Sequence, residues 1–417
     1  MDDYVIYGVA AAAAGAAYVA YSASTQKRDA SGGTGKTFDG QLTAGVTMLQ
    51  NKDTVLSRDK VNASMDEYSA LFAGKTGQSS VSGHEGGALS SEESIAQRQE
   101  NYRTMVNNFY DLVTDFYEYG WCQSFHFAPR RQGETFLESI KRAEYHLCSV
   151  LGMKPGVKAL DVGCGVGGPL RNMAAFSGAT IEGITINEYQ VTVGNKYNEQ
   201  SGLAAISHIT RGDFQNLPGF KGGELWEGID YKGADWTGQF DVAYEIEATC
   251  HSPDKQRCYS EVARCLKPGG LYAGYEWVVL PDRGYDAKNA SHVAIKEGIE
   301  IGNGLPTLAT PEQVKAALAA AGFEVLEAYD ANAGVHDVHQ LPWYETLDGK
   351  YSFSGFRMTR LGRNMTHTMI TILEKLRIAP KGTMHVSAML NATAIDLVEG
   401  GKKELFTPSY FFLAKKL

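Results

Sequence analysis

A glycine-rich turn at residues 158–171, K-A-L-D-V-G-C-G-V-G-G-P-L-R, constrains the fold more than any other stretch. The apolar residues before the turn predict a short buried strand, and Pro169 suits the first turn of a helix. Gly163, Gly165 and Gly167 tolerate positive φ angles and let the backbone approach a ligand closely. A strand, a glycine turn and a helix start together predict a seat for a cofactor.

The residues that follow the turn distinguish two kinds of cofactor. The glycines satisfy G-x-G-x-x-G, which dinucleotide and S-adenosylmethionine sites share. A dinucleotide site needs an acidic residue about twenty residues later, at the tip of the second strand. Glu182 has that spacing but falls in the middle of the strand-like run 180–186. Asp161 has no role on a pyrophosphate, whereas its carboxylate suits the amino-acid end of S-adenosylmethionine. We therefore favour S-adenosylmethionine, with a ligand-free turn as the alternative.

Length, charge and cysteine usage narrow the class of protein. A chain of 417 residues is long enough for one large α/β domain with an extension, or for two domains. The net charge is −9 and the basic residues are scattered, which argues against a nucleic-acid partner. The six cysteines form no C-x-x-C pair, which indicates reduced thiols and predicts no metal site.

The N-terminal residues carry a separate signal. Residues 4–21 contain no charge and approach the length of a membrane helix, so we predict a membrane anchor over residues 1–23. Two acidic residues precede this run and Lys27 and Arg28 follow it, which places the bulk of the protein in the cytosol. A cleaved targeting peptide or a soluble alanine-rich helix is the alternative.

Two further segments precede the glycine turn. The Gly- and Ser-rich composition of residues 24–94 predicts a flexible linker, and the spacing of apolar residues over 95–116 predicts an amphipathic helix. The segment 115–127, D-F-Y-E-Y-G-W-C-Q-S-F-H-F, then holds six aromatic side chains and His126. Aromatic rings cover flat apolar ligands, and their negative faces stabilise a nearby cation. An aromatic core closing over the sheet is the alternative, and both functions are compatible.

Strand-like and helix-like segments alternate after the turn. This alternation predicts a mostly parallel sheet with helices on both faces. The strand-like runs are 180–186, 205–210, 240–244, 271–277, 323–329 and 410–414, and the helical stretches are 188–200, 254–265 and 311–321.

Ligands bind such sheets beyond the carboxyl ends of the strands. Asn187, Glu188 and Gln190 follow the second strand and are candidates for holding the ribose of the cofactor. Asp213 and Phe214 follow the third strand and are candidates for holding and stacking the adenine.

Four segments resemble the sterol 24-C-methyltransferase family in order and spacing. They are Y-E-Y-G-W-C-Q-S-F-H-F (117–127), L-D-V-G-C-G-V-G-G-P (160–169), G-I-T-I-N-E-Y-Q (183–190) and Y-E-I-E-A-T-C-H-S-P (244–253). The resemblance covers roughly 103–417 and includes A-P-K-G-T at 379–383. Two departures stand out: Cys122 replaces the usual glycine, and 219–239 is longer than expected, which predicts a surface insertion.

The resemblance implies a fold and a domain order. It implies a Rossmann-like class I methyltransferase domain over residues 95–342, with the aromatic segment near its start. Residues 343–417 would form a helical, sterol-specific C-terminal extension with amphipathic helices around 357–376 and 386–398. Helices over the sheet could supply the deep apolar channel that a sterol requires.

The resemblance also implies the reaction. Such an enzyme transfers a methyl group from S-adenosylmethionine to C-24 of a Δ24-sterol of cycloartenol or zymosterol type, in sterol biosynthesis at the endoplasmic reticulum membrane. Its catalytic domain would face the cytosol, and a homo-oligomer is allowed. The alkene attacks the methyl group without a base, positive charge forms at C-25, a hydride shifts from C-24, and a proton then leaves. The aromatic lining assigned to that cation is Tyr117, Tyr119, Trp121 and Phe125.

The proton acceptor stays open among Glu118, His126, Glu144 and Glu247. One of these, or Asp115 or Glu245, is a candidate for binding the sterol 3-hydroxyl, and we expect Cys250 and His251 to line the site. Three other functions stay as alternatives: a methyltransferase for another lipid or amine head group, a nicotinamide-dependent oxidoreductase, and a membrane-tethered lipid carrier without catalysis.

Overall fold

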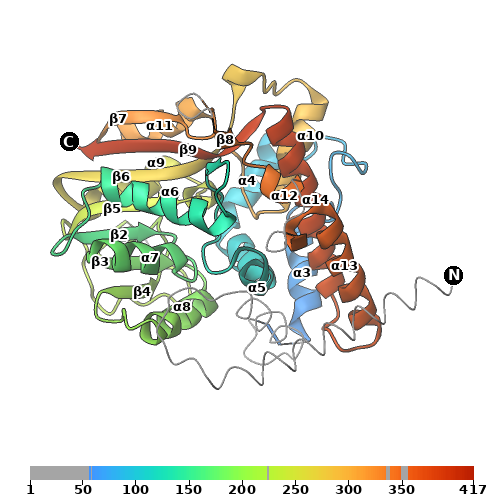
Figure 1. Cartoon of the computed structure of the whole chain (residues 1–417), viewed down its shortest axis with the longest axis horizontal. Helices are drawn as coiled ribbons and strands as arrows, with labels where there is room; N and C mark the ends of the chain where they lie inside the picture. Colours follow the sequence, from blue (N-terminus) through green and yellow to red (C-terminus); the bar gives the residue numbers. More distant parts are fainter. Residues whose placement is uncertain (1–55, 58, 223–224, 335–338, 349–355) are drawn as a thin grey trace.

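A seven-stranded sheet forms the centre of the computed structural model, in the order β4-β3-β2-β5-β6-β9-β7 (Figure 1). The structure describes residues 56–57, 59–222, 225–334, 339–348 and 356–417. The strands are β2 (Lys158–Val162), β3 (Thr180–Thr185), β4 (Ser207–Arg211), β5 (Phe240–Ile246), β6 (Leu266–Val279), β7 (Phe323–Asp330) and β9 (Phe406–Lys416). Each strand-like run of the sequence corresponds to one of these strands.

The sheet is parallel except for its C-terminal strand. β2 pairs in parallel with β3 and β5, whereas β9 runs antiparallel to both β6 and β7. Because β9 lies between β6 and β7, residues 343–417 are helical only in part: the helices predicted around 357–376 and 386–398 are followed by a strand of the main sheet, as the strand-like run 410–414 predicts. The Rossmann-like class I fold itself is confirmed.

Helices cover both faces of the sheet. One core cluster joins β2 to α9 (Lys255–Cys265) and α11 (Pro311–Ala320) through residues such as Leu160, Tyr259 and Leu318. The other joins the opposite face of β2 to α6 (Phe136–Val150) and α7 (Gly168–Ser177) through Ala159 and Leu170. α8 (Glu188–Gln200) packs beside β3 and β4. This arrangement follows from the alternation of side chains along a strand, which sends neighbouring apolar residues to opposite faces.

A second group of helices stands to one side of the sheet in Figure 1, with α5 between the two parts. The predicted helix 95–116 is divided at Asn101 into α4 (Glu92–Glu100) and α5 (Tyr102–Trp121), so the aromatic segment continues the helix. The other members are α3 (Lys60–Ala70), α10 (Ala290–Ile301), α12 (Glu345–Asp348), α13 (Arg360–Lys375) and α14 (Thr383–Lys402). β1 (Arg130–Arg131) pairs with β8 (Gln340–Leu341) outside the main sheet.

The linker prediction is wrong for the described residues before 95. Tyr68 and Phe72 are fully buried against α5 and α14, and Ser80 donates to Asp396 Oδ1 at 2.8 Å through its backbone N–H. Glu297 accepts bonds from the backbone N–H groups of Gly87 and Leu89. The composition is polar, but the hydrogen bonds that hold these residues come from acidic side chains more than 200 positions away, which local pattern cannot reveal. The predicted anchor, residues 1–23, lies outside the described residues.

Across the part of the chain that the structure describes, no helix combines the length and the apolar character required to span a bilayer.

Candidate active site

Gly163 and Gly168 of the turn stand where a larger side chain would collide with neighbouring residues. Gly163 has φ +82°, and a Cβ there would lie 2.5 Å from the Cβ of Ala248, beyond the end of β5. Gly167 has φ +76° and is the N-cap of α7, where Pro169 occupies the first turn as predicted. A Cβ on Gly168 would lie 2.0 Å from the Gln123 carbonyl oxygen. The turn is therefore closely packed against the aromatic segment and β5, and neither contact tolerates a larger residue.

A cavity of about 820 Å³, including the open space at its mouth, lies over this turn. Asp161, Gly163, Gly165, Gln190, Asp213 and Phe214 all line it, from the ends of β2, β3 and β4. This is the edge of the sheet where parallel α/β folds bind ligands. Six of the nine residues named as cofactor candidates are therefore brought together, and their binding role stays a prediction.

Asp161 is the buried acid of this cavity. Its side chain is 3% exposed, and Oδ2 accepts a hydrogen bond from the Tyr244 hydroxyl at 2.9 Å. Burial raises the pKa of Asp161 to about 7, and the charge of Glu144 adds to the rise. Within the described residues, no cation is in hydrogen-bond contact with this carboxyl group. A ligand with an ammonium group would supply the missing partner.

Two further cofactor candidates do not point into the cavity. Asn187 caps α8, since its Oδ1 accepts from the Gln190 N–H at 3.0 Å while its Nδ2 donates to Asp111 at 2.6 Å. Glu188 is exposed and pairs with Arg211 at 2.9 Å. Gly167, the third, shapes the turn and does not line the cavity. Helix capping explains why an Asn directly after a strand need not contact a ligand.

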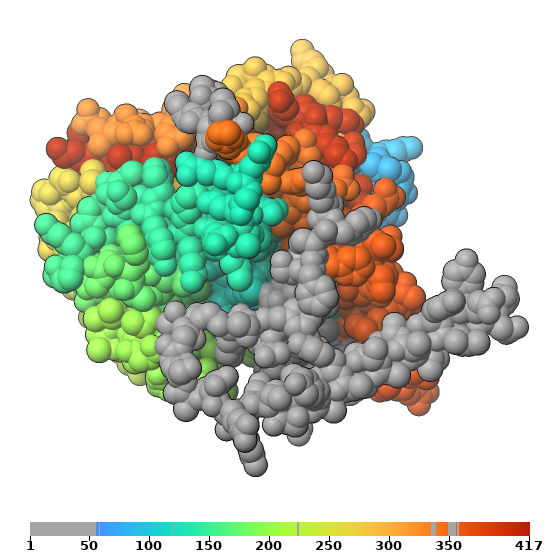
Figure 2. Space-filling model, in the orientation of Figure 1, coloured from blue at the N-terminus to red at the C-terminus, as the bar shows by residue number. Residues whose placement is uncertain are grey.

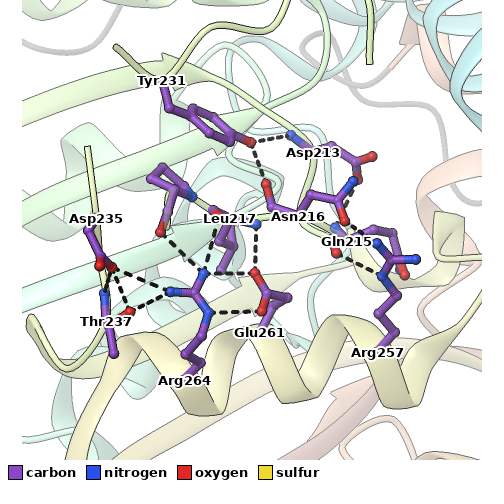
Figure 3. A network of polar contacts seen from close by, with 11 residues as sticks. Asp213, Gln215, Asn216, Leu217, Tyr231, Asp235, Thr237, Arg257, Glu261 and Arg264 are labelled. Carbon is purple, nitrogen blue, oxygen red and sulfur yellow. Dashed lines mark hydrogen bonds and ion pairs between the residues drawn. The ribbon is translucent and has the colours of Figure 1, made fainter. Parts of the chain in front are cut away.

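The predicted surface insertion at 219–239 helps to hold Asp213 and Asn216 in the loop after β4. Figure 3 shows Tyr231 reaching back from this segment: its hydroxyl lies 3.2 Å from the Asp213 N–H and 2.6 Å from the Asn216 carbonyl. Arg264 of α9 is bound to Glu261 and to the Leu217 carbonyl in the same network. The insertion therefore stabilises the loop after β4, although part of it is exposed.

The sequence did not lead us to expect that α5 lines the first cavity. Tyr102, Val106 and Tyr110 are spaced by four residues and line the cavity together. Tyr110 lies 2.9 Å from His251 Nε2, and His251 Nδ1 lies 3.1 Å from the Gly304 carbonyl. A carbonyl only accepts, so Nδ1 carries the proton and Nε2 accepts from Tyr110. Burial lowers the pKa of His251 to about 4, so the ring is neutral. The spacing of apolar residues over 95–116 predicts an amphipathic helix, but it does not show which side chains of that helix line a cavity.

A second cavity of about 920 Å³ lies between α5 and the C-terminal helices. The aromatic segment supplies Tyr117, Trp121 and Phe125 to its wall, as predicted. The opposite wall comes from α13 and α14, with Arg363, Thr366, Leu390 and Ala394 among the lining residues. The exposed surface of this cavity is mostly apolar, and its volume includes the open space at its mouth.

The rings of this wall lock one another in edge-to-face contacts. Tyr117 and Phe125 have ring centroids 5.5 Å apart at 75°, and Trp121 and Phe127 have centroids 4.7 Å apart at 74°. The Tyr117 hydroxyl also donates to Asn303 Oδ1 at 3.3 Å. The side chain of Tyr119 lies outside what the structure describes. The predicted aromatic core and the predicted aromatic pocket wall are thus the same residues.

The two cavities share three lining residues: Phe125, His126 and Glu247. Glu247 directly follows β5, has φ +54°, and accepts the Phe127 N–H through Oε1 at 2.8 Å. A positive φ in a non-glycine residue is a strained conformation that often marks a functional site. Burial raises the pKa of Glu247 well above its ordinary value, and the nearby carboxyl of Glu245 raises it further.

Of the other acid and base candidates, His126 belongs to this junction, whereas Glu118 and Glu144 line neither cavity. Glu144 is fully buried and accepts from Ser124 at 2.9 Å and Asn172 at 2.8 Å, with His126 Nε2 at 3.3 Å. His126 Nδ1 donates to the Phe127 carbonyl at 2.7 Å, so both ring nitrogens are engaged. Glu118 accepts from the Tyr197 hydroxyl at 2.7 Å on the outer side of α5.

Four more candidate residues also lie outside the second cavity. Asp115 accepts from Tyr189, and Glu245 accepts from the Ala248 N–H at 2.9 Å. Cys250 packs in the core, whereas His251 lines the first cavity.

Cys122 ends α5 with φ +63° and ψ −132°, backbone angles that glycine adopts readily and other residues do not. It lines neither of the two cavities described above. The glycine that usually stands there in the resembling family has a conformational reason, and the substitution does not alter the wall of the second cavity.

The second cavity combines apolar walls with several polar side chains, and two of its side chains have a buried donor without a partner among the described residues: Arg363 Nε and Trp277 Nε1. Arg363 donates through Nη1 to the Leu347 carbonyl at 2.6 Å, but its buried Nε has no partner among the described residues. A buried donor of this kind, lining a cavity, is available to an oxygen of a ligand. The arrangement can therefore hold a cationic cofactor in one cavity, a long apolar molecule with one polar end in the other, and developing charge between them.

Comparison with known families identifies three segments of the chain. Residues 353–416 match the model for the sterol methyltransferase C-terminal region, 94–223 match that for mycolic acid cyclopropane synthetase, and 234–274 match a methyltransferase domain. Curated relatives match far more of the chain. The cycloartenol-C-24-methyltransferase 1 of Oryza sativa subsp. japonica is 44% identical over 362 residues, 87% of this chain and 94% of the relative.

Two other relatives agree. The cycloartenol-C-24-methyltransferase of Arabidopsis thaliana is 45% identical, covering 77% of this chain and 89% of the relative. The sterol 24-C-methyltransferase of Schizosaccharomyces pombe is 40% identical, covering 78% and 83%.

Solved structures show the same fold at low sequence identity. The crystal structure of the [4+2]-cyclase SpnF has a TM-score of 0.52 at 20% identity and covers 75% of this chain and 94% of its own. A geranyl diphosphate methyltransferase in complex with GPP and sinefungin has a TM-score of 0.51 at 15% identity, covering 77% and 99%.

Proposed function

The chain belongs to the sterol 24-C-methyltransferase family, and on that premise we propose that it transfers a methyl group from S-adenosylmethionine to C-24 of a Δ24-sterol side chain in sterol biosynthesis. The observation that carries this proposal is the meeting of two cavities at Phe125, His126 and Glu247. One cavity has the chemistry of a cofactor seat and the other that of a sterol channel. A donor and an acceptor placed in them would meet at these three side chains.

The residues of the first cavity fit S-adenosylmethionine. Asp161 and Gly163 line the same cavity, and the buried Asp161 carboxyl has no cation in hydrogen-bond contact among the described residues. Asp161 would hold the ammonium group, Gln190 the ribose, and Asp213 and Phe214 the adenine. When bound, the cofactor supplies an electrophilic methyl group.

The chain then has three tasks. An alkene needs no base to attack, so Tyr117, Trp121 and Phe125 must first align the side chain and exclude water. Their ring faces then stabilise the positive charge at C-25, each good ring contributing about 1–2 kcal/mol when desolvated. A carboxylate must finally accept the proton that leaves the sterol.

We assign that proton to Glu247. It lines both cavities, whereas Glu118 and Glu144 line neither, and both nitrogens of His126 are already bonded. Its raised pKa favours the neutral acid when no cation is present. The positive charge of the bound cofactor would lower that pKa, so Glu247 would lose its proton to solvent before methyl transfer, and the resulting carboxylate would accept the proton that leaves the sterol.

The other end of the sterol is assigned to Arg363. Its unpaired Nε is a donor inside the second cavity, and the sterol 3-hydroxyl is an oxygen acceptor on an otherwise apolar molecule. The acceptor we propose is a cycloartenol-type sterol, because two relatives at 44–45% identity are cycloartenol methyltransferases.

A methyl-transfer assay tests the function. The full chain is incubated with methyl-labelled S-adenosylmethionine and either cycloartenol or its 24,25-dihydro form, each delivered from cyclodextrin. We expect label in cycloartenol alone. Label in neither sterol, with S-adenosylmethionine still bound, would reject the proposed substrate and leave the methyltransferase fold.

We also propose that the protein resides at the endoplasmic reticulum membrane, with its catalytic part facing the cytosol. The uncharged run at 4–21 and the basic Lys27 and Arg28 after it support this topology. Removing residues 1–23 should release the protein from carbonate-washed microsomes, and retention of the truncated chain would contradict the anchor. A homo-oligomer is a further proposal, which light scattering of the purified chain tests.

A further inference from the structure

α13 has two faces of opposite exposure. Five apolar side chains on its outer face are between 44% and 63% exposed: Leu361, Met365, Met369, Ile372 and Leu376. At 3.6 residues per turn they fall within an arc of about 80°. Single exposed apolar residues are ordinary, but a stripe along four turns of one helix marks an interaction surface.

The inner face of the same helix belongs to the site. Arg363 and Thr366 of α13 line the second cavity, and Ile370 is fully buried. α13 packs on α14, with η3 (Phe356–Met358) at its start. Figure 1 places α13 at the margin of the molecule, away from the sheet, and the orange-red surface of the C-terminal helices occupies that side in Figure 2. One helix thus separates the proposed sterol cavity from the exterior.

Charge around the stripe favours an anionic partner. Arg360, Lys375, Arg377 and Lys381 are exposed at or beside the ends of α13. The helix has one acidic residue, Glu374, whose carboxyl accepts the backbone N–H groups of Gly382 and Met384 at 3.1 and 2.7 Å. The chain as a whole carries −9, so this basic border is a local exception. An apolar stripe between basic residues is the pattern of a helix that lies in the interface of an anionic bilayer.

We propose that the outer face of α13 docks in the surface of an anionic lipid bilayer, so that a sterol passes from the bilayer into the second cavity beside this helix without crossing water. This proposal rests on the proposed function for the identity of the cargo. The contact differs from the predicted anchor at 1–23, because it is a peripheral contact made by a folded part of the enzyme. It explains why apolar side chains remain exposed on a helix whose other face lines the cavity.

A local probe tests the docking independently of any other membrane contact. Met369→Trp in the full chain places an indole on the stripe, and Leu326→Trp on β7, where Leu326 is 45% exposed, is the matched control. Difference fluorescence against the unaltered chain is recorded with vesicles of phosphatidylcholine and phosphatidylglycerol, with and without bromine on the acyl chains.

We expect the probe at position 369 to shift to shorter wavelength on vesicle addition and to be quenched at least threefold more by bromolipid than the probe at 326. Equal quenching at both positions would overturn the proposal. So would a probe at 369 that is already shielded from acrylamide before vesicles are added, because residues 1–55 or a second copy of the chain would then cover the stripe.

A functional experiment separates this proposal from the proposed reaction. The triple variant Met365→Gln, Met369→Gln, Ile372→Gln changes only exposed positions. We expect its kcat/KM to fall about tenfold for a Δ24-sterol presented in anionic vesicles and to stay within twofold for the same sterol in cyclodextrin. Equal values for both presentations, relative to the unaltered chain, would overturn docking. No turnover of the cyclodextrin substrate by the unaltered chain would instead reject the reaction, while the fluorescence result would still decide the docking.

Discussion

The backbone N–H of Phe127 donates to Glu247 Oε1 across 2.8 Å, and this bond joins the end of the aromatic segment to the end of β5. Its two residues are 120 positions apart in the chain. Glu247 is held in a strained conformation with φ +54°, and the bond fixes one carboxyl oxygen while the side chain faces both cavities. The position of the acid is therefore determined by the aromatic segment as well as by the sheet.

Tyr117→Leu should slow methyl transfer without weakening the cofactor. The ring lines the second cavity only and packs edge-on against Phe125. Loss of one ring beside a cation costs about 1–2 kcal/mol, so kcat should fall about 5- to 30-fold. The dissociation constant of S-adenosylmethionine, measured by calorimetry, should change less than twofold. Tyr117→Phe is the control and should retain most activity, whereas equal losses of turnover and cofactor binding would assign Tyr117 to folding.

Asp161→Asn should weaken S-adenosylmethionine binding about 100-fold, because the amide keeps the Tyr244 contact but cannot pair with an ammonium group. The pH dependence follows from the raised pKa of about 7, compared with 3.8 for a free carboxyl. The folded state holds this proton more tightly, so the stability contributed by this group is lost as pH rises from about 4 to 7.

Cofactor affinity should change in the opposite direction. It should rise about fivefold between pH 6 and pH 7 as the Asp161 carboxylate forms, and the Asn variant should lose this rise. Calorimetric titrations at the two pH values measure both quantities. The same pH dependence in the variant would show that another group titrates.

Arg363→Gln should raise the KM for a 3-hydroxysterol about tenfold, since a buried hydrogen bond to a charged donor is lost. A 3-deoxysterol with the same side chain lacks that oxygen, so its KM should be unchanged by the substitution. Steady-state assays with sterols delivered from cyclodextrin give both ratios. If the substitution affected the two sterols equally, Arg363 would be a structural residue of α13.

Cys122→Gly should stabilise the protein by about 1 kcal/mol, because φ +63° with ψ −132° is costly for a residue with a Cβ. Cys122→Ala retains the Cβ and should bring no comparable gain, which makes it the matched control. Urea unfolding of the three proteins measures the difference. A similar gain in both variants would trace the effect to the thiol and not to the backbone.

The sheet and its helices could be predicted from the sequence because their signals are local. β2, the glycine turn and Pro169 lie within a dozen residues, and each later strand shows its own apolar run. The antiparallel position of β9 is set by pairing with β6 and β7, far away in the chain, and no local pattern encodes it. The described residues before 95 were predicted to be a linker for the same reason: the buried side chains of Glu297 and Asp396, which hold them in place, lie far away in the sequence.

For the site, the sequence predicted which kinds of residue take part more reliably than which individual side chains face the cavities. Three of the four predicted rings, Tyr117, Trp121 and Phe125, line the second cavity, and the glycine turn and the strand ends supply most of the predicted lining of the first. Asn187 was assigned to a ligand but caps a helix, and Glu144 was a candidate base but lies one layer behind His126. Such differences depend on which way a side chain points, and only the packed structure determines this.

The most direct test is whether the junction of the two cavities stabilises positive charge. The affinity of the full chain, loaded with S-adenosylhomocysteine, is measured for a sterol with an ammonium nitrogen in place of C-25 and for its uncharged carbon isostere. We expect the ammonium compound to bind about 100-fold more tightly, and Glu247→Gln to reduce that ratio to about tenfold or less. Equal affinities in the unaltered protein would contradict the assignment of this junction as the place where the sterol cation forms.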